Sequence, residues 1–402
     1  MLDRNWTPER VRHNFQIDLI GGITGGIFIA VLVAFMPVVV RRMGGSPLDV
    51  ALVVAAPFIG HLLSPVFAYL LTGFHPVRVV VASIALARAV FLVGMLVATT
   101  PLMFAMSTVA FWVIAIANVA AYTALMAGIY PQGERAQAMS RVRMGAAVAG
   151  IAAAALAGAF IDAVPAAWAF AAATVVSLPG ALQFARIRYD GPAERALRRG
   201  AGTIARDIWG DRRFRLLLLS FSVFGFGNLM NLAVVPILLV DHFDAPNAFV
   251  GLFTALQSAT MIVAFLFVGR RIDRGSSLRF TLYNTALVLL LPLGYLLAPT
   301  TWALLPIAVV GGIVLAGAEI TYHTNVVQLA PVGRVLEYAA AQSFLLGVRG
   351  TAAPFAASAL MAAIEPRAVL VVGLTFMLAG LAVMTRAVRE PTAERVIEAA
   401  PA

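Results

Sequence analysis

Five ionisable side chains stand inside long apolar stretches of this 402-residue chain. They are His61, Arg88, Glu319, His323 and Arg349. At the centre of a bilayer a charged side chain costs about 2.5–3.5 kcal/mol or more unless it is paired or hydrated, so each of these groups is a candidate for function. Carboxylates and imidazoles can carry protons, and guanidinium groups can bind anions. The chemistry to consider first is therefore the handling of protons or anions.

Glu319 and Arg349 are the first pair to consider. They lie at similar depth in two consecutive apolar stretches, so we predict an ion pair between them. In one interpretation the pair is a coupling device, because protonation of Glu319 or an anion at Arg349 would break it and favour one conformation. The alternative is a permanent structural bridge, and the sequence leaves both open. His323 follows Glu319 by one helical turn and could relay protons to it.

Arg88 and His61 are buried candidates without an obvious partner. Arg88 stands about ten residues from either end of its apolar stretch, too deep for its guanidinium group to reach water easily. It could bind a substrate anion, but we favour a structural role. For His61 the simpler interpretation is a neutral imidazole that is hydrogen-bonded to a neighbouring helix.

Asp18 stands near the beginning of the first apolar stretch. A carboxylate close to the membrane surface can remain hydrated. We therefore expect Asp18 to act in a gate, through contact with an arginine such as Arg143, and not in proton transport.

Uncharged polar residues form a second set of candidates. Their amide and hydroxyl groups could orient a substrate, or could join helices through hydrogen bonds worth about 0.6 kcal/mol each. The set consists of Asn118, Tyr122, Asn228, Asn231, Gln257 and Tyr322. The remaining residues of these stretches are apolar and include several phenylalanines, which suits an amphipathic organic molecule better than a sugar.

Composition indicates which elements must position these groups. The chain is 61% hydrophobic and 12% charged, whereas soluble domains are roughly 45–50% apolar and about 25% charged. This profile predicts an integral membrane protein, and the net charge of +10 then reflects topology and not nucleic-acid binding. The chain has no cysteine and carries no zinc-protease, phosphate-loop or nucleophile-elbow motif. We expect no enzyme activity, no cofactor and no metal site.

Twelve apolar runs are long enough to cross a bilayer, which takes roughly 20 residues in a helix. They cover residues 15–40, 48–72, 77–99, 102–129, 141–163, 166–185, 214–240, 247–269, 279–298, 302–328, 339–363 and 367–388. Glycine, proline and charged residues separate them, as in Gly44-Gly45-Ser46-Pro47. The sequence therefore predicts an all-α membrane protein with twelve transmembrane helices.

Arginine is distributed unequally between the two sides of this arrangement. If the N-terminus is cytoplasmic, the outer segments hold only Arg41, Arg42 and Arg367, and all other arginines outside the spans fall on the inner side. By the positive-inside rule both termini are predicted to be cytoplasmic, and we expect the bacterial inner membrane. The arginine-rich segment 186–215 then lies in water, where it could contact anionic lipids or only fix the topology.

The two halves of the chain repeat each other. Prolines flank the first loop of each half at the same spacing, and a tyrosine and a proline close the fourth and tenth spans in the same way. The pairs are Pro37 and Pro47, Pro236 and Pro246, Tyr122 and Pro131, and Tyr322 and Pro331. An offset of about 200 residues relates these pairs and predicts two pseudo-symmetric six-helix bundles, a transporter arrangement. We predict bundles at 1–190 and 213–402, joined by a cytoplasmic linker at 191–212.

The loop between spans eight and nine reads Gly269-Arg270-Arg271-Ile272-Asp273-Arg274-Gly275. It resembles the Gly-x-x-x-Asp-Arg signature of the major facilitator superfamily, and the resemblance extends over essentially the whole chain. It implies that this loop latches the cytoplasmic side, with gating roles for Gly269, Asp273 and Arg274. It also implies that spans one, four, seven and ten line a central cavity. Span five lacks the Gly-Pro pair that marks many drug/proton antiporters of the family.

These observations predict a secondary transporter that works by alternating access. We expect proton-coupled efflux of a small amphipathic organic compound by a monomer. The alternative within transport is a uniporter or a lipid or lysolipid flippase, in which the ion pair is only a gate. A protein of another class, a membrane scaffold or receptor with the same fold, stays open as well.

Overall fold

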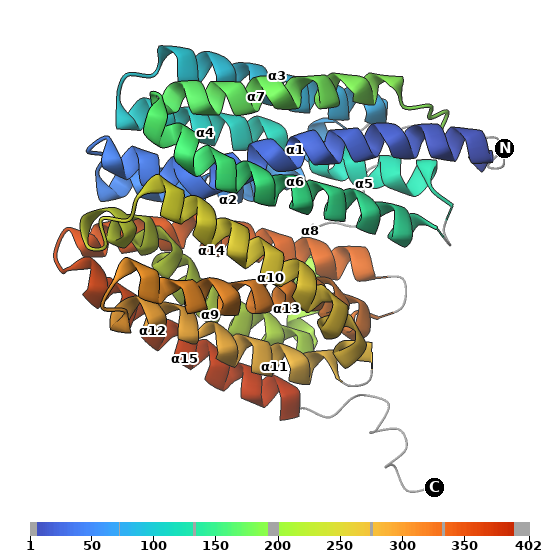
Figure 1. Cartoon of the computed structure of the whole chain (residues 1–402). Coiled ribbons are helices and arrows are strands. Elements are labelled where there is room, and N and C mark those ends of the chain that lie inside the picture. The colour runs from blue at the N-terminus through green and yellow to red at the C-terminus, as the bar shows by residue number, and fades with distance from the viewer. Residues whose placement is uncertain are drawn as a thin grey trace, which may run out of the picture.

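The computed structural model is helical throughout the residues that it describes. These are residues 6–71, 73–131, 134–191, 201–273, 276–331 and 334–389, and they contain no β-strand. In Figure 1 the long helices run side by side along one direction. The predicted all-α membrane fold is confirmed.

The first part of the chain, called the N-terminal half below, ends in a short 3-10 helix. It consists of α1 (Pro8–Arg42), α2 (Pro47–Leu70), α3 (Pro76–Val97), α4 (Pro101–Ala115), α5 (Asn118–Ile129), α6 (Arg135–Ala163), α7 (Ala166–Gln183) and η2 (Phe184–Arg186). Proline occupies the first turn of α1, α3 and α4. A proline is tolerated there because the amide that it lacks would have no partner inside the helix.

The second part, called the C-terminal half, follows a separate helix α8 (Ala201–Gly210). It consists of α9 (Arg212–Asp241), α10 (Asn247–Asp273), α11 (Ser277–Val288), α12 (Leu290–Leu297), η3 (Thr301–Leu304), α13 (Leu305–Leu329), α14 (Val335–Met361) and α15 (Pro366–Arg389). Asp211 caps α9, because its side chain accepts a hydrogen bond from the backbone amide of Phe214. Ser276 caps α11 in the same way, with the amide of Arg279 as the donor. The predicted bundle limits of 1–190 and 213–402 stay a prediction.

Within the described residues, eleven helical segments are long and apolar enough to cross a membrane, and Pro101–Ala115 is a shorter apolar helix. Together α4 and α5 cover the predicted fourth span, so the predicted twelve spans agree with the structure. The interruption after α4 is a tightened turn, in which the amide of Ala117 donates to the carbonyl of Ile114. No proline or glycine stands there, so no residue type indicates this interruption. In the ninth span the break between α11 and α12 precedes Pro292, which cannot donate a backbone hydrogen bond.

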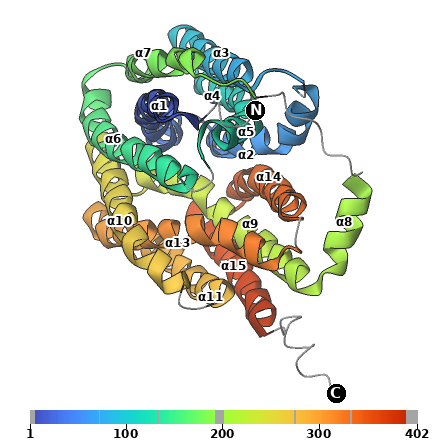
Figure 2. The ribbon, with the colours of Figure 1, turned by 90° about the vertical axis from the view of Figure 1, so that its right-hand side faces the viewer.

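The two halves lie next to each other with their helices aligned. Figure 1 shows the N-terminal half above the C-terminal half, and Figure 2 shows the same halves end-on, with α8 to one side. We call the end at which α1 begins and α15 ends the inner end, and the end at which α1 ends and α2 begins the outer end. These names follow the predicted orientation, which stays a prediction.

Buried apolar residues are distributed differently at the two ends. Toward the outer end one cluster joins both halves and includes Phe28 and Phe35 of α1 with Val234 and Ile237 of α9. Toward the inner end each half has a cluster of its own, around Tyr130 in one and Tyr338 in the other. Among the described residues, the halves therefore share a hydrophobic core only toward the outer end.

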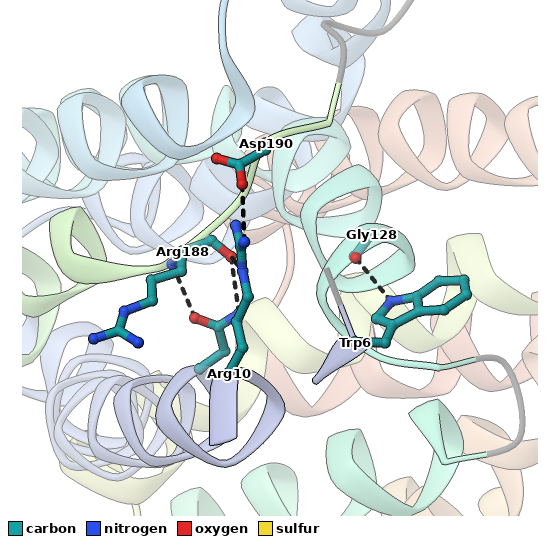
Figure 3. A network of polar contacts seen from close by, with 6 residues as sticks. Trp6, Arg10, Gly128, Arg188 and Asp190 are labelled. Carbon is teal, nitrogen blue, oxygen red and sulfur yellow. Dashed lines mark hydrogen bonds and ion pairs between the residues drawn. The ribbon is translucent and has the colours of Figure 1, made fainter. Parts of the chain in front are cut away.

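At the inner end of the N-terminal half, the chain after η2 is fastened to α1 (Figure 3). Nε of Arg10 donates to the carbonyl of Arg188 at 3.0 Å, and Nη1 of Arg10 forms an ion pair with Asp190 at 2.8 Å. Asn14 exchanges two hydrogen bonds with the backbone of Arg188, at 2.9 and 3.0 Å. The indole of Trp6 donates to the carbonyl of Gly128 at 3.0 Å. These contacts stay within one half.

Candidate functional site

Glu319 forms an ion pair, but its partner is not the predicted one. Nη1 of Arg143 on α6 donates to Oε1 of Glu319 on α13 at 3.3 Å. The Arg143 side chain is 63% exposed and the Glu319 side chain 54% exposed. Since α6 and α13 belong to different halves, this ion pair crosses between them. The prediction that Glu319 pairs with Arg349 is wrong in this structure.

Depth along the helices accounts for the observed pair. Glu319 stands ten residues before the end of α13 at Leu329, and Arg143 stands eight residues after the start of α6 at Arg135. At about 1.5 Å per residue these distances from the inner end are similar. The two charges therefore meet at one level, on helices that the sequence does not show to be neighbours.

Arg349 instead lies against α9 within the C-terminal half. Its Nη1 donates to the backbone carbonyl of Phe221, and its guanidinium carbon lies 5.9 Å from the centroid of the Phe221 ring. The Nε atom is buried and has no hydrogen-bond partner. Among the described residues Arg349 forms no ion pair.

Asp18 is fully buried, with 0% of its surface exposed. The hydroxyl of Tyr122 donates to Oδ1 at 3.0 Å, and the hydroxyl of Tyr130 donates to Oδ2 at 2.9 Å. The expectation that Asp18 stays hydrated and contacts Arg143 is wrong in this structure. The reason is that α1 begins at Pro8, which places Asp18 about 15 Å along the helix.

Arg88 is buried within the N-terminal half, 7% exposed. Its guanidinium carbon lies 5.8 Å from the centroid of the Phe28 ring, and its Nε has no hydrogen-bond partner. A Cβ added at Gly25 of α1 would lie 3.4 Å from Nη2 of Arg88. Packing against α1 supports the structural role that we favoured from the sequence.

Two of the polar candidates make contacts inside the C-terminal half. Nδ2 of Asn231 on α9 lies 3.4 Å from the sulfur of Met377 on α15, and Gln257 on α10 packs against Gly311 of α13. The backbone carbonyl of Tyr322 accepts a hydrogen bond from Gln342 at 2.9 Å. The hydroxyl of Tyr122 donates its hydrogen bond to Asp18. A role in substrate binding stays a prediction for each of them.

Asn118, Asn228 and His61 are each partly exposed. Asn118 begins α5 directly after the interruption of span four. The backbone beside His61 on α2 packs against Gly347 of α14, which places this histidine next to the C-terminal half. Their roles in substrate binding stay predictions.

The predicted gating loop falls largely outside the described residues. The helix α10 extends to Asp273, but the side chains of residues 269–275 are not among those described, and the same holds for the side chain of His323. The gating roles of Gly269, Asp273 and Arg274 and the proton relay through His323 therefore stay predictions.

The outer end carries polar contacts between the halves that sequence reasoning missed. Nε of Arg41 on α1 donates to both carboxylate oxygens of Asp241 on α9 at 3.0 Å. The neighbouring Arg42 donates to the carbonyl of Ala245 and lies 3.8 Å from Asp162 of α6. Asp162 also accepts a hydrogen bond from Asn247 of α10 at 2.6 Å. These contacts join the two halves at the outer end.

Close backbone packing supports these contacts. Gly158 on α6 faces the start of α10, and a Cβ added to it would lie 2.5 Å from the carbonyl oxygen of Asn247 and 3.0 Å from the Cα of Ala248. No side chain fits there without a shift of the backbone. A glycine is therefore needed for α6 and α10 to approach this closely.

The sequence pattern that defines the Major Facilitator Superfamily matches residues 19–348 of this chain. The chain belongs to this superfamily. The match covers most of both halves, and the family confirms that the protein is a membrane transporter. No curated protein matches the chain.

Solved structures of other transporters share the fold of this major facilitator. The nucleoside transporter NupG matches with a TM-score of 0.71 at 9% identity, over 93% of this chain and 99% of that one. A bacterial homologue of the human lysosomal transporter Spinster, inward-facing and occupied, matches with a TM-score of 0.67 at 14% identity, over 96% and 98%. The peptide transporter POT in complex with sulfate matches with a TM-score of 0.69 at 11% identity, over 93% of each chain. At such identities the likeness shows the fold alone.

The repeat in the sequence of this transporter could have predicted one contact that sequence reasoning missed, the ion pair between Arg41 and Asp241. Arg41 and Asp241 are 200 residues apart, which is the offset that relates the prolines around them. Equivalent positions near the axis of a two-fold repeat face each other, so opposite charges there predict a pair. No comparable pattern in the sequence predicts the contact of Tyr130 with Asp18 or that of Asp162 with Asn247.

Proposed function

We propose that this major facilitator is a secondary active transporter that exports a small amphipathic organic compound in exchange for protons. In this proposal Glu319 carries the proton and Arg143, in place of Arg349, is its partner. The transporter alternates between access from the inner end and access from the outer end.

The observation that carries the proposal is the half-exposed ion pair between Arg143 and Glu319 at the boundary between the halves. Protonation of Glu319 neutralises the carboxylate and removes its attraction to Arg143, so the proton and the contact between α6 and α13 are linked. Since both side chains are about half exposed, the pair contributes about 0.2–1 kcal/mol. Such an energy shifts a two-state equilibrium by up to about fivefold.

Side chains of α9 offer the apolar and polar groups that an amphipathic substrate would need. Phe221 and Phe226 of α9 are partly buried apolar side chains, and Asn228 adds an amide on the same helix. The similar solved structures include a nucleoside transporter and a peptide transporter, so both of those substrate classes belong in a screen.

Orientation and partners form part of the proposal. We place the inner end, with both termini, in the cytoplasm and the protein in a bacterial inner membrane as a monomer. Arg188, which follows η2, and Arg206 of α8 would then face anionic lipid headgroups.

The test is substrate-driven proton movement in liposomes that contain a pH-sensitive dye. Wild type would be compared with Glu319→Gln and with Glu337→Gln, a matched control. Glu337 also pairs with an arginine near the inner end, Arg334 at 2.8 Å, but both residues belong to α14 or its cap. We expect hydrophobic cations, lysolipids or organic anions to drive proton flux in wild type and in Glu337→Gln, and not in Glu319→Gln.

Substrate movement without protons, unchanged by Glu319→Gln, would contradict the proposal and leave a uniporter or flippase. Loss of flux in Asp18→Asn with normal flux in Glu319→Gln would move the proton site to the buried carboxylate of α1. Absence of any substrate movement would favour a scaffold or receptor.

A further inference from the structure

Arg349 holds a positive charge in the middle of a transmembrane helix. It stands fourteen residues after the first residue of α14, Val335, and twelve before the last, Met361. In the membrane such a charge is unfavourable unless it is paired or hydrated. The carboxylate predicted to pair with it, Glu319, is bound to Arg143.

The hydrogen bonds of Arg349 leave one edge of its guanidinium group without a partner. Nη1 donates to the carbonyl of Phe221, whereas Nε and Nη2 make no hydrogen bond within the described part of the chain. Nε and Nη2 point along the same edge of the planar group. Two parallel donors of this kind match the two oxygens of a carboxylate or a phosphate.

The surroundings of Arg349 offer both apolar and polar contacts. The Phe221 ring lies against the guanidinium group, with its centroid 5.9 Å from the guanidinium carbon. Gly225 of α9 leaves the space that the group fills, because a Cβ there would lie 2.7 Å from Nε and from the guanidinium carbon. The backbone carbonyl of Phe221 supplies the polar contact.

Arg88 shows what a structural arginine looks like in this chain. It too lies over a phenylalanine ring and has an unpartnered Nε, but it is buried between helices of one half with 7% exposure. Arg349 is partly exposed, and its helix α14 packs against α2 of the other half through Gly347 and Gly350. Arg349 therefore keeps exposed surface that a ligand can contact, whereas Arg88 keeps very little.

We propose that Arg349 binds the anionic group, a carboxylate or a phosphate, of an amphipathic substrate. Phe221 contacts the apolar part that adjoins this group. The inference rests on the proposed transport function and narrows its substrate class to anionic amphipaths. The anionic group can belong to a free organic acid or to the headgroup of a single-chain lipid.

The experiment measures binding by calorimetry to the full chain in phosphatidylcholine nanodiscs. The probes are octanoate, octyl phosphate and lysophosphatidylglycerol, with octylammonium and octanol as cationic and neutral counterparts of the same chain length. We expect the anionic probes to bind wild type. Arg349→Gln should weaken them about tenfold or more, because it removes the charge and the paired donors. Arg349→Lys should bind these probes more tightly than Arg349→Gln but more weakly than wild type. Lysine keeps the positive charge but lacks the two parallel N–H donors of the planar guanidinium group.

Two further variants separate binding from folding. Arg88→Gln is the matched control and should leave the affinity for octanoate unchanged. Gly225→Ala keeps the charge but places a Cβ against the guanidinium group, so it should weaken octanoate and not octanol. Tighter binding of octanoate would identify a free organic acid as the ligand, and tighter binding of lysophosphatidylglycerol a lipid.

Equal octanoate affinity in wild type, Arg349→Gln and Gly225→Ala would overturn the inference, as would an equal loss in Arg88→Gln. Binding is measured without a proton gradient, so the outcome is independent of proton coupling. Loss of proton flux in Glu319→Gln with intact octanoate binding supports both proposals. Normal anion binding in a protein that moves no protons contradicts only the coupling mechanism.

Discussion

The two ends of the boundary between the halves differ in how they are held together. At the outer end, Arg41 binds Asp241 and Arg42 donates to the backbone carbonyl of Ala245, next to a hydrophobic cluster shared by both halves. At the inner end, the described residues contribute one half-exposed ion pair between the halves, Arg143 with Glu319, and each half has a separate apolar cluster. The halves are joined at the outer end by packing as well as by charge.

From this difference we expect the two ends to open by different means. In the proposed mechanism, shared apolar packing holds the outer end shut, whereas the inner end depends on an ion pair that protonation of Glu319 would break. Buried apolar surface contributes about 25 cal/mol for each Å², so opening the outer end must be compensated by new contacts at the inner end. The following variants test this asymmetry, beginning with the largest expected effect.

Gly158→Val should have the largest effect, because it places a side chain against the backbone of Asn247. We expect α6 and α10 to be held apart, the outer end to stay open, and transport to fall about tenfold or more. The measurement is maleimide labelling of a single cysteine at Ala154, which is 0% exposed. The natural chain has no cysteine, so labelling has no background.

Labelling of the Ala154 cysteine should rise in Gly158→Val and stay low in Gly210→Ala, a control whose added Cβ meets no atom within 4 Å. A fully active Gly158→Val protein with a protected cysteine would contradict the view that packing closes the outer end.

Charge reversal at the outer ion pair should have a smaller effect. The Arg41 and Asp241 side chains are 25% and 39% exposed, so the pair contributes about 0.2–1 kcal/mol. Arg41→Asp alone should raise labelling of the same cysteine by up to about fivefold. The double variant with Asp241→Arg should return labelling toward the wild-type value, because the opposite charges are restored. If the double variant labels like the single one, the pair does not hold the outer end.

The contact between Arg10 and Asp190 lies within one half and should have the smallest effect. The hydrogen bond from Arg10, together with its charge, lowers the pKa of Asp190. A lowered pKa in the folded state stabilises the protein above the unfolded pKa of about 3.9, and this contribution is lost as the pH falls below that value. Asp190→Asn should therefore lower the melting temperature slightly at pH 7, and the difference from wild type should shrink as the pH falls below about 3.9.

Transport and Ala154 labelling should be unchanged in Asp190→Asn, because the contact does not cross between the halves. A large change in either would show that contacts inside a half also control opening, which would weaken the comparison of the two ends.

Much of the fold could be predicted because a membrane restricts the chain strongly. A helix that crosses a bilayer satisfies its own backbone hydrogen bonds, so its length is visible as an apolar run. The twelve runs agree with the helices, and the repeat offset of about 200 residues recurs in the pair of Arg41 and Asp241. The interruption at Ile116 and Ala117 could not be predicted, because neither residue disfavours a helix strongly.

The sequence by itself determined which charges lie in apolar spans and that Glu319 and Arg349 are at similar depth, because depth is counted along a helix from its end. Asp18 lies deeper than its apolar run indicated, since α1 begins at Pro8. It did not determine which charges meet. Each residue turns a helix by about 100°, and the rotation of a whole helix depends on its packing against all its neighbours. Only the tertiary structure decided that Glu319 contacts Arg143 of the other half and that Arg349 contacts Phe221 of the same half.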